Sequence, residues 1–200
     1  GMHVNAVQKL ARSYEHIEPS SIGNHQTILV SELAGQSNVI LKARAIGIEL
    51  KKGSPEVVAV LQELKQLEHL GYEFEAAEAS FELLIRRVLK LIKPFWELLE
   101  YHCTYIRSVR NQYETCEATV KLRVNDEDIY TVAEGDGPVN ALDAALRKAL
   151  VPVYPTIESV TLDDYKVRIS GTSHGTGART RVLIDSTDHQ DNWCTVGVSD

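Results

Sequence analysis

The stretch whose residue types and spacing most clearly suggest a binding site is Thr131–Leu150, TVAEGDGPVNALDAALRKAL. Two glycines there lie directly before a predicted helix. Gly135 and Gly137 leave the backbone bare ahead of that helix, and Pro138 suits a first helical turn. A helix N-terminus presents unpaired N–H groups and a partial positive charge, which together bind anions. A ligand carboxylate could therefore be received at this turn. The alternative is a well-formed turn into a helix that only packs, and the residues alone leave both interpretations open.

The helix that follows the turn is strongly specified by its own residues. Asp136 or Gly137 can cap its start, and Pro152 ends it. Asp143 and Arg147 are spaced as an i, i+4 ion pair on an exposed face. The apolar stripe that we expect to face the core comprises Val139, Leu142, Leu146, Ala149 and Leu150.

We expect no metal, disulfide or phosphate site elsewhere in the chain. The seven histidines show no H-x-H, H-x-x-x-H or Cys/His spacing, so we expect no metal site within this chain. Cys103, Cys116 and Cys194 are odd in number and unclustered, which fits reduced thiols in a cytoplasmic protein. Gly171–Gly177, GTSHGTG, lacks the Gly-Lys-Ser/Thr ending of a phosphate loop and is predicted to be a hairpin loop.

Helical patterns dominate the first half of the chain. Gln26–Leu33 has the length and composition of a strand, and Gln36–Ile46 has apolar residues at helical spacing. Ser54-Pro55-Glu56 is a helix start, and Gly71 closes the helix that it begins. Glu75–Ile92 then predicts a second helix, which would form an antiparallel hairpin with the first.

From Phe95 the pattern changes to strands. The predicted strands are Trp96–Arg107, Glu117–Val124, Asp128–Ala133, Ser159–Ser170, Arg179–Asp185 and Trp193–Val198. Thr131-Val132 with Gly135-Asp136 recurs 64 residues later as Thr195-Val196 with Ser199-Asp200. The unit of strands followed by a helix is therefore used twice.

The second copy stops where its helix would begin. A strand unit without its covering helix has an unburied apolar face, so we expect this chain to be a fragment. The residues that we expect to line the uncovered face are Val182, Ile184, Val196 and Val198.

The net charge and composition of the chain indicate which kinds of binding partner it does not favour. Lys and Arg number 21 against 28 Asp and Glu, a net charge of −7, which disfavours nucleic acid and anionic membranes as partners. The chain has no long apolar run and no signal-peptide pattern at its start, so we expect a soluble, cytoplasmic protein. The fold class predicted is α+β.

Several segments resemble one enzyme family in order along the whole chain. The resemblance is carried by GMHVNAVQK, SYEHI, ILVSELAGQSNVILKA, LEHLGYEFEAAEASFELLIRR, EGDGPVNALDAALRKAL and LDDYKVRI. These segments resemble the C-terminal half of the citramalate synthase and 2-isopropylmalate synthase family. The stretch from Gly71 to Leu84 resembles the citramalate synthases more than the 2-isopropylmalate synthases.

The resemblance implies a domain organisation. Family members have a catalytic TIM barrel that binds a divalent metal, and this chain would start after it. Residues 1–52 and 53–93 would be two linker subdomains, the second a helical hairpin, and residues 94–200 a regulatory domain that forms a homodimer. No cofactor is then expected in the chain itself, since the metal belongs to the absent barrel.

Two positions of the first linker subdomain carry catalytic roles in the family. They correspond to His3, in the G-x-H motif, and to Tyr14. An imidazole can move a proton near neutral pH, and a phenol can hold the substrate or donate a proton. Without the family resemblance, His3 would be taken as an exposed terminal residue and Tyr14 as a packed ring.

The resemblance also implies an effector amino acid near the dimer interface. Its carboxylate would meet N–H groups of the turn, and three side chains would line a pocket for its side chain. The residues concerned are Gly135, Gly137, Pro138, Val139 and Asn140 for the turn, and Leu142, Tyr165 and Val167 for the pocket.

The resulting functional hypothesis is the linker and regulatory part of an acyltransferase that condenses acetyl-CoA with pyruvate to (R)-citramalate in isoleucine biosynthesis. Isoleucine is the expected feedback effector, and the fragment alone is expected to be inactive. The alternatives are 2-isopropylmalate synthase, with leucine as effector, and a free-standing amino-acid-binding or dimerisation module.

Overall fold

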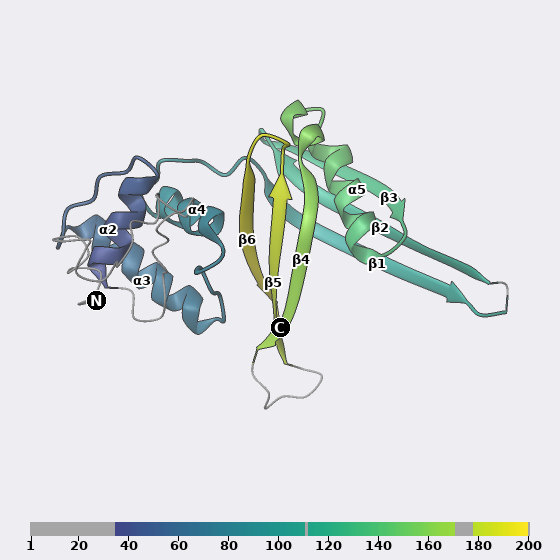
Figure 1. Cartoon of the computed structure of the whole chain (residues 1–200). Coiled ribbons are helices and arrows are strands. Elements are labelled where there is room, and N and C mark those ends of the chain that lie inside the picture. Colours follow the sequence, from purple (N-terminus) through teal and green to yellow (C-terminus); the bar gives the residue numbers. More distant parts are fainter. Residues whose placement is uncertain (1–34, 111, 171–177, 200) are drawn as a thin grey trace. The chain divides into compact units, whose positions relative to one another are not determined.

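The computed structural model of the chain describes residues 35–110, 112–170 and 178–199 and has an α+β architecture (Figure 1). This confirms the predicted class, and no barrel occurs among the described residues. The chain divides into two compact units, one formed by 1–92, 162–187 and 191–200 and the other by 93–161 and 188–190. His3, Tyr14, the predicted strand Gln26–Leu33 and the loop Gly171–Gly177 lie outside the described residues. The division into two linker subdomains and a regulatory domain stays a prediction.

The first unit combines three helices with an antiparallel sheet. The helices are α2 (Gln36–Ala45), α3 (Pro55–His69) and α4 (Glu78–Val88). The sheet has the order β4-β5-β6, with β4 (Thr161–Ser170), β5 (Arg179–Thr187) and β6 (Asn192–Ser199). The strand predicted to begin at Ser159 begins later, because a 3₁₀ turn, η3 (Pro155–Ser159), precedes it.

Helix α3 begins and ends as its sequence predicts. The Ser54 Oγ accepts a hydrogen bond from the Val57 N–H at 3.4 Å and so caps the first turn. Gly71 follows the helix with φ +100°, a conformation that side chains other than glycine rarely adopt. Two main-chain hydrogen bonds across this turn then satisfy the last carbonyls of the helix.

Helix α4 is shorter than the predicted span Glu75–Ile92. It ends because Lys90 adopts φ +56°, and the Leu91 N–H then bonds back to the Arg86 carbonyl at 2.8 Å. Leu91 is therefore left 55 % exposed instead of continuing the apolar stripe. The expected pairing of α3 with α4 as a helical hairpin is confirmed, since buried residues of both helices belong to one core.

That core also receives a side chain from the sheet. Its buried members are Val39, Ala43, Val60, Leu64, Phe74, Phe81, Leu84 and Ile85. Val196 of β6 packs against this cluster. On β5, the Arg181 guanidinium donates to the Gly71 carbonyl and forms an ion pair with Glu73. The turn after α3 is thus held to the sheet by a largely buried cation.

The second unit is a three-stranded antiparallel sheet with one helix. Its strands are β1 (Glu97–Ser108), β2 (Tyr113–Val124) and β3 (Glu127–Gly135), in the order β1-β2-β3. Helix α5 (Pro138–Leu150) runs along one face of this sheet (Figure 1). The predicted boundaries of α5 are confirmed, as is the pair formed by Asp143 and Arg147, whose Oδ2 and Nε atoms are 2.7 Å apart.

The buried stripe of α5 differs from the predicted one. The residues that the helix buries are Ala141, Ala145, Ala149 and Leu150. Val139 is 57 % exposed, and Leu142 and Leu146 are only half-buried at the edges of the contact. The prediction was wrong in the centre of the stripe because small alanine side chains allow the helix to approach the sheet closely. Leu142 and Leu146 then fit only beside the contact.

The predicted repeat is confirmed in the strand register. Val120 pairs with Thr131 in the first sheet, and Ile184 pairs with Thr195 in the second, both 64 residues later. The same spacing relates every pair common to the two hairpins. The two sheets therefore share strand order, direction and register.

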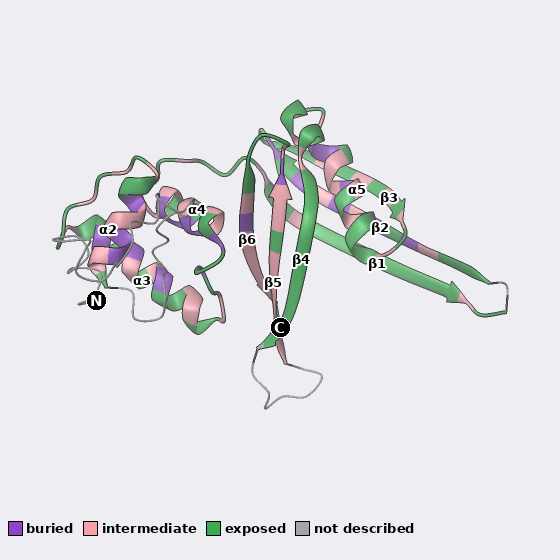
Figure 2. Ribbon diagram, in the orientation of Figure 1, coloured by how far each residue is buried: buried purple, intermediate pink, exposed green. Residues whose placement is uncertain are grey.

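The two sheets differ in how one face is covered. In the first sheet, α5 buries Ala118 and Val120. In the second sheet, the Lys166 and Asp185 side chains are in contact, so they lie on the same face. Because side chains alternate along a strand, the odd-numbered residues of β4 and Ile184 of β5 lie on the other face. This β4 patch comprises Tyr165, Val167 and Ile169, which are 50 %, 55 % and 71 % exposed. Figure 2 shows that β4 is exposed along its length.

Val182 and Ile184 lie on the face that was expected to be uncovered, whereas Val196 packs on the helical core instead.

Within the described part of the chain, no helix is long and apolar enough to cross a membrane.

Candidate functional site

The turn before α5 has main-chain donors that its own helix does not use. Gly137 occupies the N-cap position in an extended conformation, with φ −172°, and no side chain caps the helix. The Asn140 Oδ1 instead accepts from the Asp136 N–H at 3.2 Å. Val139 and Asn140 occupy the second and third helical positions, whose N–H groups have no intrahelical acceptor. They are the donors that a ligand carboxylate would use.

Gly135 fixes the shape of this turn. A Cβ atom at this position would lie 2.5 Å from the Ala141 nitrogen and 2.5 Å from the Asn140 Oδ1. A side chain there would therefore collide with the first turn of α5. The absence of a side chain allows β3 to end directly against the helix start.

Acidic side chains surround a hollow beside the turn. The hollow has a volume of about 530 Å³ and is lined by Glu114, Thr115, Glu134, Gly135 and Asp136. Glu134 lies directly opposite Glu117 in the register of β3 and β2, an arrangement of like charges that destabilises a sheet. A cationic group placed here would relieve that repulsion. The helix start thus has unused N–H donors, and carboxylates line the hollow beside the turn.

One of these carboxylates is already engaged. Glu114 lies 3.7 Å from the Arg107 Nε. The hydrogen bond of Tyr105 to Glu114 raises the pKa of the Tyr105 phenol, because it favours the protonated form. Among the described residues, Glu134 and Asp136 have no ion-pair partner, so these two carboxylates remain available to a ligand cation.

The remaining predicted site residues lie on α5 and β4 or outside the described residues. Leu142 is half-buried and packs against the core of the second unit. Tyr165 and Val167 lie on β4 in the first unit, where both are exposed. Their predicted role in lining an effector pocket, and the catalytic roles of His3 and Tyr14, therefore stay predictions.

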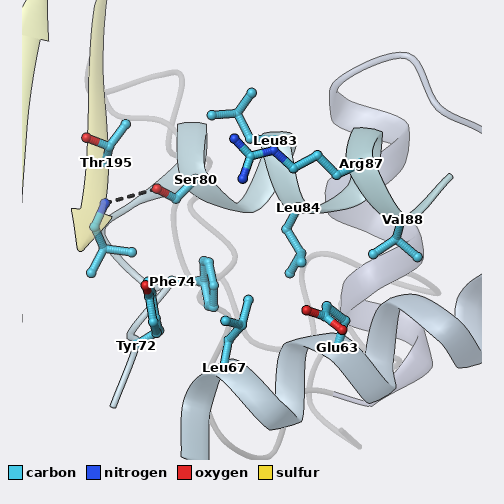
Figure 3. Close-up of a pocket in the computed structure, with 11 residues that line it drawn as sticks. Glu63, Leu67, Tyr72, Phe74, Ser80, Leu83, Leu84, Arg87, Val88 and Thr195 are labelled. Atoms are coloured by element: carbon cyan, nitrogen blue, oxygen red, sulfur yellow. Dashed lines mark hydrogen bonds between the residues drawn. The ribbon is translucent and has the colours of Figure 1, made fainter. Parts of the chain in front are cut away.

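A second hollow, of about 590 Å³, lies in the first unit and was not predicted. It is lined by Glu63, Leu67, Tyr72, Phe74, Ser80, Leu83, Leu84, Arg87, Val88, Thr195 and Val196. Figure 3 shows the Ser80 hydroxyl, which accepts a hydrogen bond from the Val196 N–H at 3.0 Å. The partners are 116 residues apart in sequence, so no local pattern could have paired them. The hollow lies where the helical hairpin meets the edge strand β6.

Two cysteines that look unrelated in the sequence are neighbours in the structure. The Sγ atoms of Cys103 and Cys116 are 3.3 Å apart. The description of the three cysteines as unclustered was therefore wrong, although all three are free thiols. The predicted strand Glu117–Val124 begins one residue after Cys116, whereas β2 begins at Tyr113, so the predicted strands did not bring the two cysteines together.

Metal-binding groups are not assembled in the described residues. Across 35–110, 112–170 and 178–199, no group of three or more His, Cys, Asp or Glu side chains could hold a metal ion. The residues described here therefore do not fit a divalent cation, and we derive no chemical step through one.

Two families match the chain in succession. The LeuA allosteric (dimerisation) domain matches residues 75–200, which include both sheets, α5 and the glycine turn. The chain belongs to this family. The family described as homocitrate synthase post-HMGL domain-like matches residues 1–71. The turn into α5 thus lies within a domain whose family description names allostery and dimerisation.

Curated relatives resemble the chain over its full length. It is 47 % identical over 200 residues to the (R)-citramalate synthase of Aquifex aeolicus and 49 % identical over 202 residues to that of Synechocystis. These matches cover 100 % of this chain but only 38 % and 37 % of the two relatives. The chain therefore spans little more than a third of their length. The resemblance to the citramalate synthase family is confirmed.

Proposed function

We propose that this chain is the linker and regulatory part of a synthase that condenses acetyl-CoA with pyruvate to give (R)-citramalate. The proposal is supported mainly by the full-length similarity to proteins named (R)-citramalate synthase. The chain forms a homodimer through its LeuA dimerisation domain, and isoleucine, the end product of this route, acts as feedback effector. The divalent metal and the substrates are bound by the barrel of the complete enzyme, so the chain alone does not catalyse the condensation.

The turn before α5 is the proposed receptor for the charged groups of the effector. An α-amino acid carries a carboxylate and an ammonium group on the same carbon atom. The N–H groups of Val139 and Asn140 bind the carboxylate, and Glu134 and Asp136 bind the ammonium group. The supporting observations are the uncapped helix start and the opposed carboxylates beside it.

Calorimetric titration of the chain with isoleucine, leucine and a non-branched amino acid tests this assignment. We expect isoleucine to bind most tightly, and its binding to weaken at least tenfold in the double variant Glu134→Gln, Asp136→Asn. Lys148→Gln, a change of charge in the last turn of α5, is the control and should bind as the parent does. Tighter binding of leucine would support the 2-isopropylmalate synthase assignment instead.

Activity assays separate the effector site from the catalytic assignment. The chain alone should release no free CoA from acetyl-CoA in the presence of pyruvate, whatever divalent metal is added. In the complete enzyme, His3→Ala should lower turnover by about 10²- to 10⁴-fold, the usual contribution of a general base. An unchanged rate in that variant would remove His3 from the proposed mechanism and leave the effector site untouched.

A further inference from the structure

Two thiols of the second unit face each other across neighbouring strands. Cys103 lies on β1 and Cys116 on β2, with their Sγ atoms 3.3 Å apart. In the strand register, Cys103 lies opposite Ala118 and Cys116 lies opposite Tyr105. The two cysteines are therefore diagonal neighbours, and both side chains lie on the sheet face that α5 covers.

We propose that Cys103 and Cys116 are a modification site at which a small-molecule disulfide, such as glutathione disulfide, forms a reversible intrachain disulfide bond. A disulfide bond is about 2.05 Å long, so the sulfur atoms must approach by roughly 1.2 Å. Diagonal neighbours are farther apart than residues directly opposite each other. The remaining distance is closed by β1, an edge strand that pairs only with β2 among the described strands.

Burial determines which thiol reacts first. Cys103 is partly exposed, whereas Cys116 is completely buried. Burial and the hydrogen bond with Cys103 raise the pKa of the Cys116 thiol, which makes its thiolate scarce. The incoming disulfide is therefore attacked by Cys103.

The exchange then proceeds in two balanced steps. The Cys103 thiolate attacks one sulfur of the small disulfide, forms a mixed disulfide and expels the first small thiolate. Cys116 loses its proton to solvent, and its sulfur attacks the Cys103 Sγ and expels the second small thiolate. Two protein thiols are oxidised, and one small disulfide is reduced to two thiols.

The bond would form directly beside the candidate turn. Cys116 pairs with Gly135 in the register of β2 and β3. A disulfide that draws β1 toward β2 therefore acts on the strand that holds this glycine in place. The oxidation itself needs no amino acid at the turn and is tested without one.

The third cysteine is a matched internal control. Cys194 lies on β6 in the first unit and is buried. Burial, the hydrogen bond with Asp185 and the charge of that carboxylate raise the pKa of the Cys194 thiol to about 12. It should keep its proton and remain unmodified.

The test equilibrates the folded chain with buffers of glutathione and glutathione disulfide, followed by acid quenching, alkylation under denaturing conditions and mass spectrometry. The number of alkylated thiols should fall from three to one. Because Arg107 and Arg110 lie between the two cysteines, trypsin should leave their peptides joined only by the disulfide. Added reductant should restore three alkylated thiols.

Single variants test the order of the steps. Cys116→Ala should stop at one glutathione on Cys103, Cys103→Ala should leave Cys116 unmodified, and Cys194→Ala should form the disulfide as the parent does. Three alkylated thiols after full equilibration, a mixed disulfide that persists in the parent, or a bond that involves Cys194 or a second chain would each overturn the proposal.

Discussion

Gly135 and Gly137 look equivalent in the sequence, and the structure separates them. A Cβ at Gly135 would lie 2.5 Å from the Ala141 nitrogen, whereas nothing lies within 4 Å of a Cβ at Gly137. Gly137 also has φ −172°, which any residue adopts. The first glycine is therefore required by packing, and the second is not.

This difference predicts unequal effects of the same substitution. Gly135→Ala should lower the free energy of unfolding by about 1–3 kcal/mol, the usual cost of overpacking, because the new methyl group displaces the start of α5. Gly137→Ala is the matched control and should leave stability within about 0.5 kcal/mol of the parent. Urea unfolding followed by circular dichroism measures both. Equal midpoints for the two variants would contradict the observed packing.

The Cys194 thiol predicts a dependence of stability on pH. Its pKa rises from an ordinary value of 9.0 to about 12 in the folded chain, first through burial and then through its hydrogen bond with Asp185. A folded-state pKa above the unfolded value stabilises the fold below pH 9, and this contribution is lost as pH rises from 9 to 12. The stability of the parent relative to Cys194→Ala should therefore be constant from pH 7 to 8 and fall above pH 9.

Urea midpoints of parent and variant across this range measure the effect. Taking the difference between the two proteins removes the titration of lysines and tyrosines, which both share. A difference that stays constant up to pH 11 would show that the Cys194 pKa is not raised.

At the level of elements, α5 shows how a helix can be predicted correctly and its packing face incorrectly. Its ends follow from Pro138 and Pro152, and its periodicity is helical throughout. The large apolar residues, however, do not lie at the centre of the contact. Ala145 does, and its carbonyl accepts a hydrogen bond from the Thr131 hydroxyl at 2.8 Å.

The observed packing therefore predicts other effects of substitutions in α5 on stability than the apolar stripe expected from the sequence does. Ala145→Leu should destabilise the chain by about 1–3 kcal/mol, because a larger side chain separates the helix from β3. Val139→Ala should change stability by less than about 0.5 kcal/mol, since the valine is mostly exposed. Thermal unfolding of the two variants beside the parent decides the matter. A larger loss for Val139→Ala would restore the stripe expected from the sequence.

Element ends are harder to predict than the elements themselves. No glycine follows α4 near Lys90, yet Lys90 has a positive φ and the helix ends at Val88, four residues before the predicted end at Ile92. Two main-chain hydrogen bonds, from Lys90 to Arg87 and from Leu91 to Arg86, accompany this conformation, and apolar periodicity does not predict them.

At the level of the whole molecule, the two sheets share one register but not one environment. The β4 patch of Tyr165, Val167 and Ile169 is exposed, although the corresponding face of the first sheet lies under α5. Exposed apolar patches of this kind promote association. The patch lies within the residues that match the LeuA allosteric (dimerisation) domain, so we expect association through this surface.

We predict that the double variant Val167→Asp, Ile169→Asp associates at least tenfold more weakly than the parent. Charges on the patch would have to be desolvated on association, which is costly. Val109→Asp, at a residue of the other unit that is 84 % exposed, is the control. Sedimentation velocity over a hundredfold range of concentration measures the association. Unchanged association of the double variant would mean that another surface joins the chains.

The features that the sequence predicted correctly are those that depend on neighbouring residues or that recur along the chain. The span of α5, the caps of α3 and the 64-residue repeat follow from main-chain hydrogen bonding and near-neighbour periodicity, which short windows of sequence record. The strand registers extend the repeat to further residues, since Ile184 has the place in its sheet that Val120 has in the first.

Contacts between distant residues were decided only by the fold. The pairing of Ser80 with Val196, the approach of Cys103 to Cys116 and the collision that makes Gly135 necessary all depend on how side-chain volumes fit when the strands and helices pack. Residue type and spacing do not record those volumes in three dimensions. The chemistry of the turn was therefore predictable as a possibility, while its acidic surroundings and its redox-active neighbour required the tertiary structure.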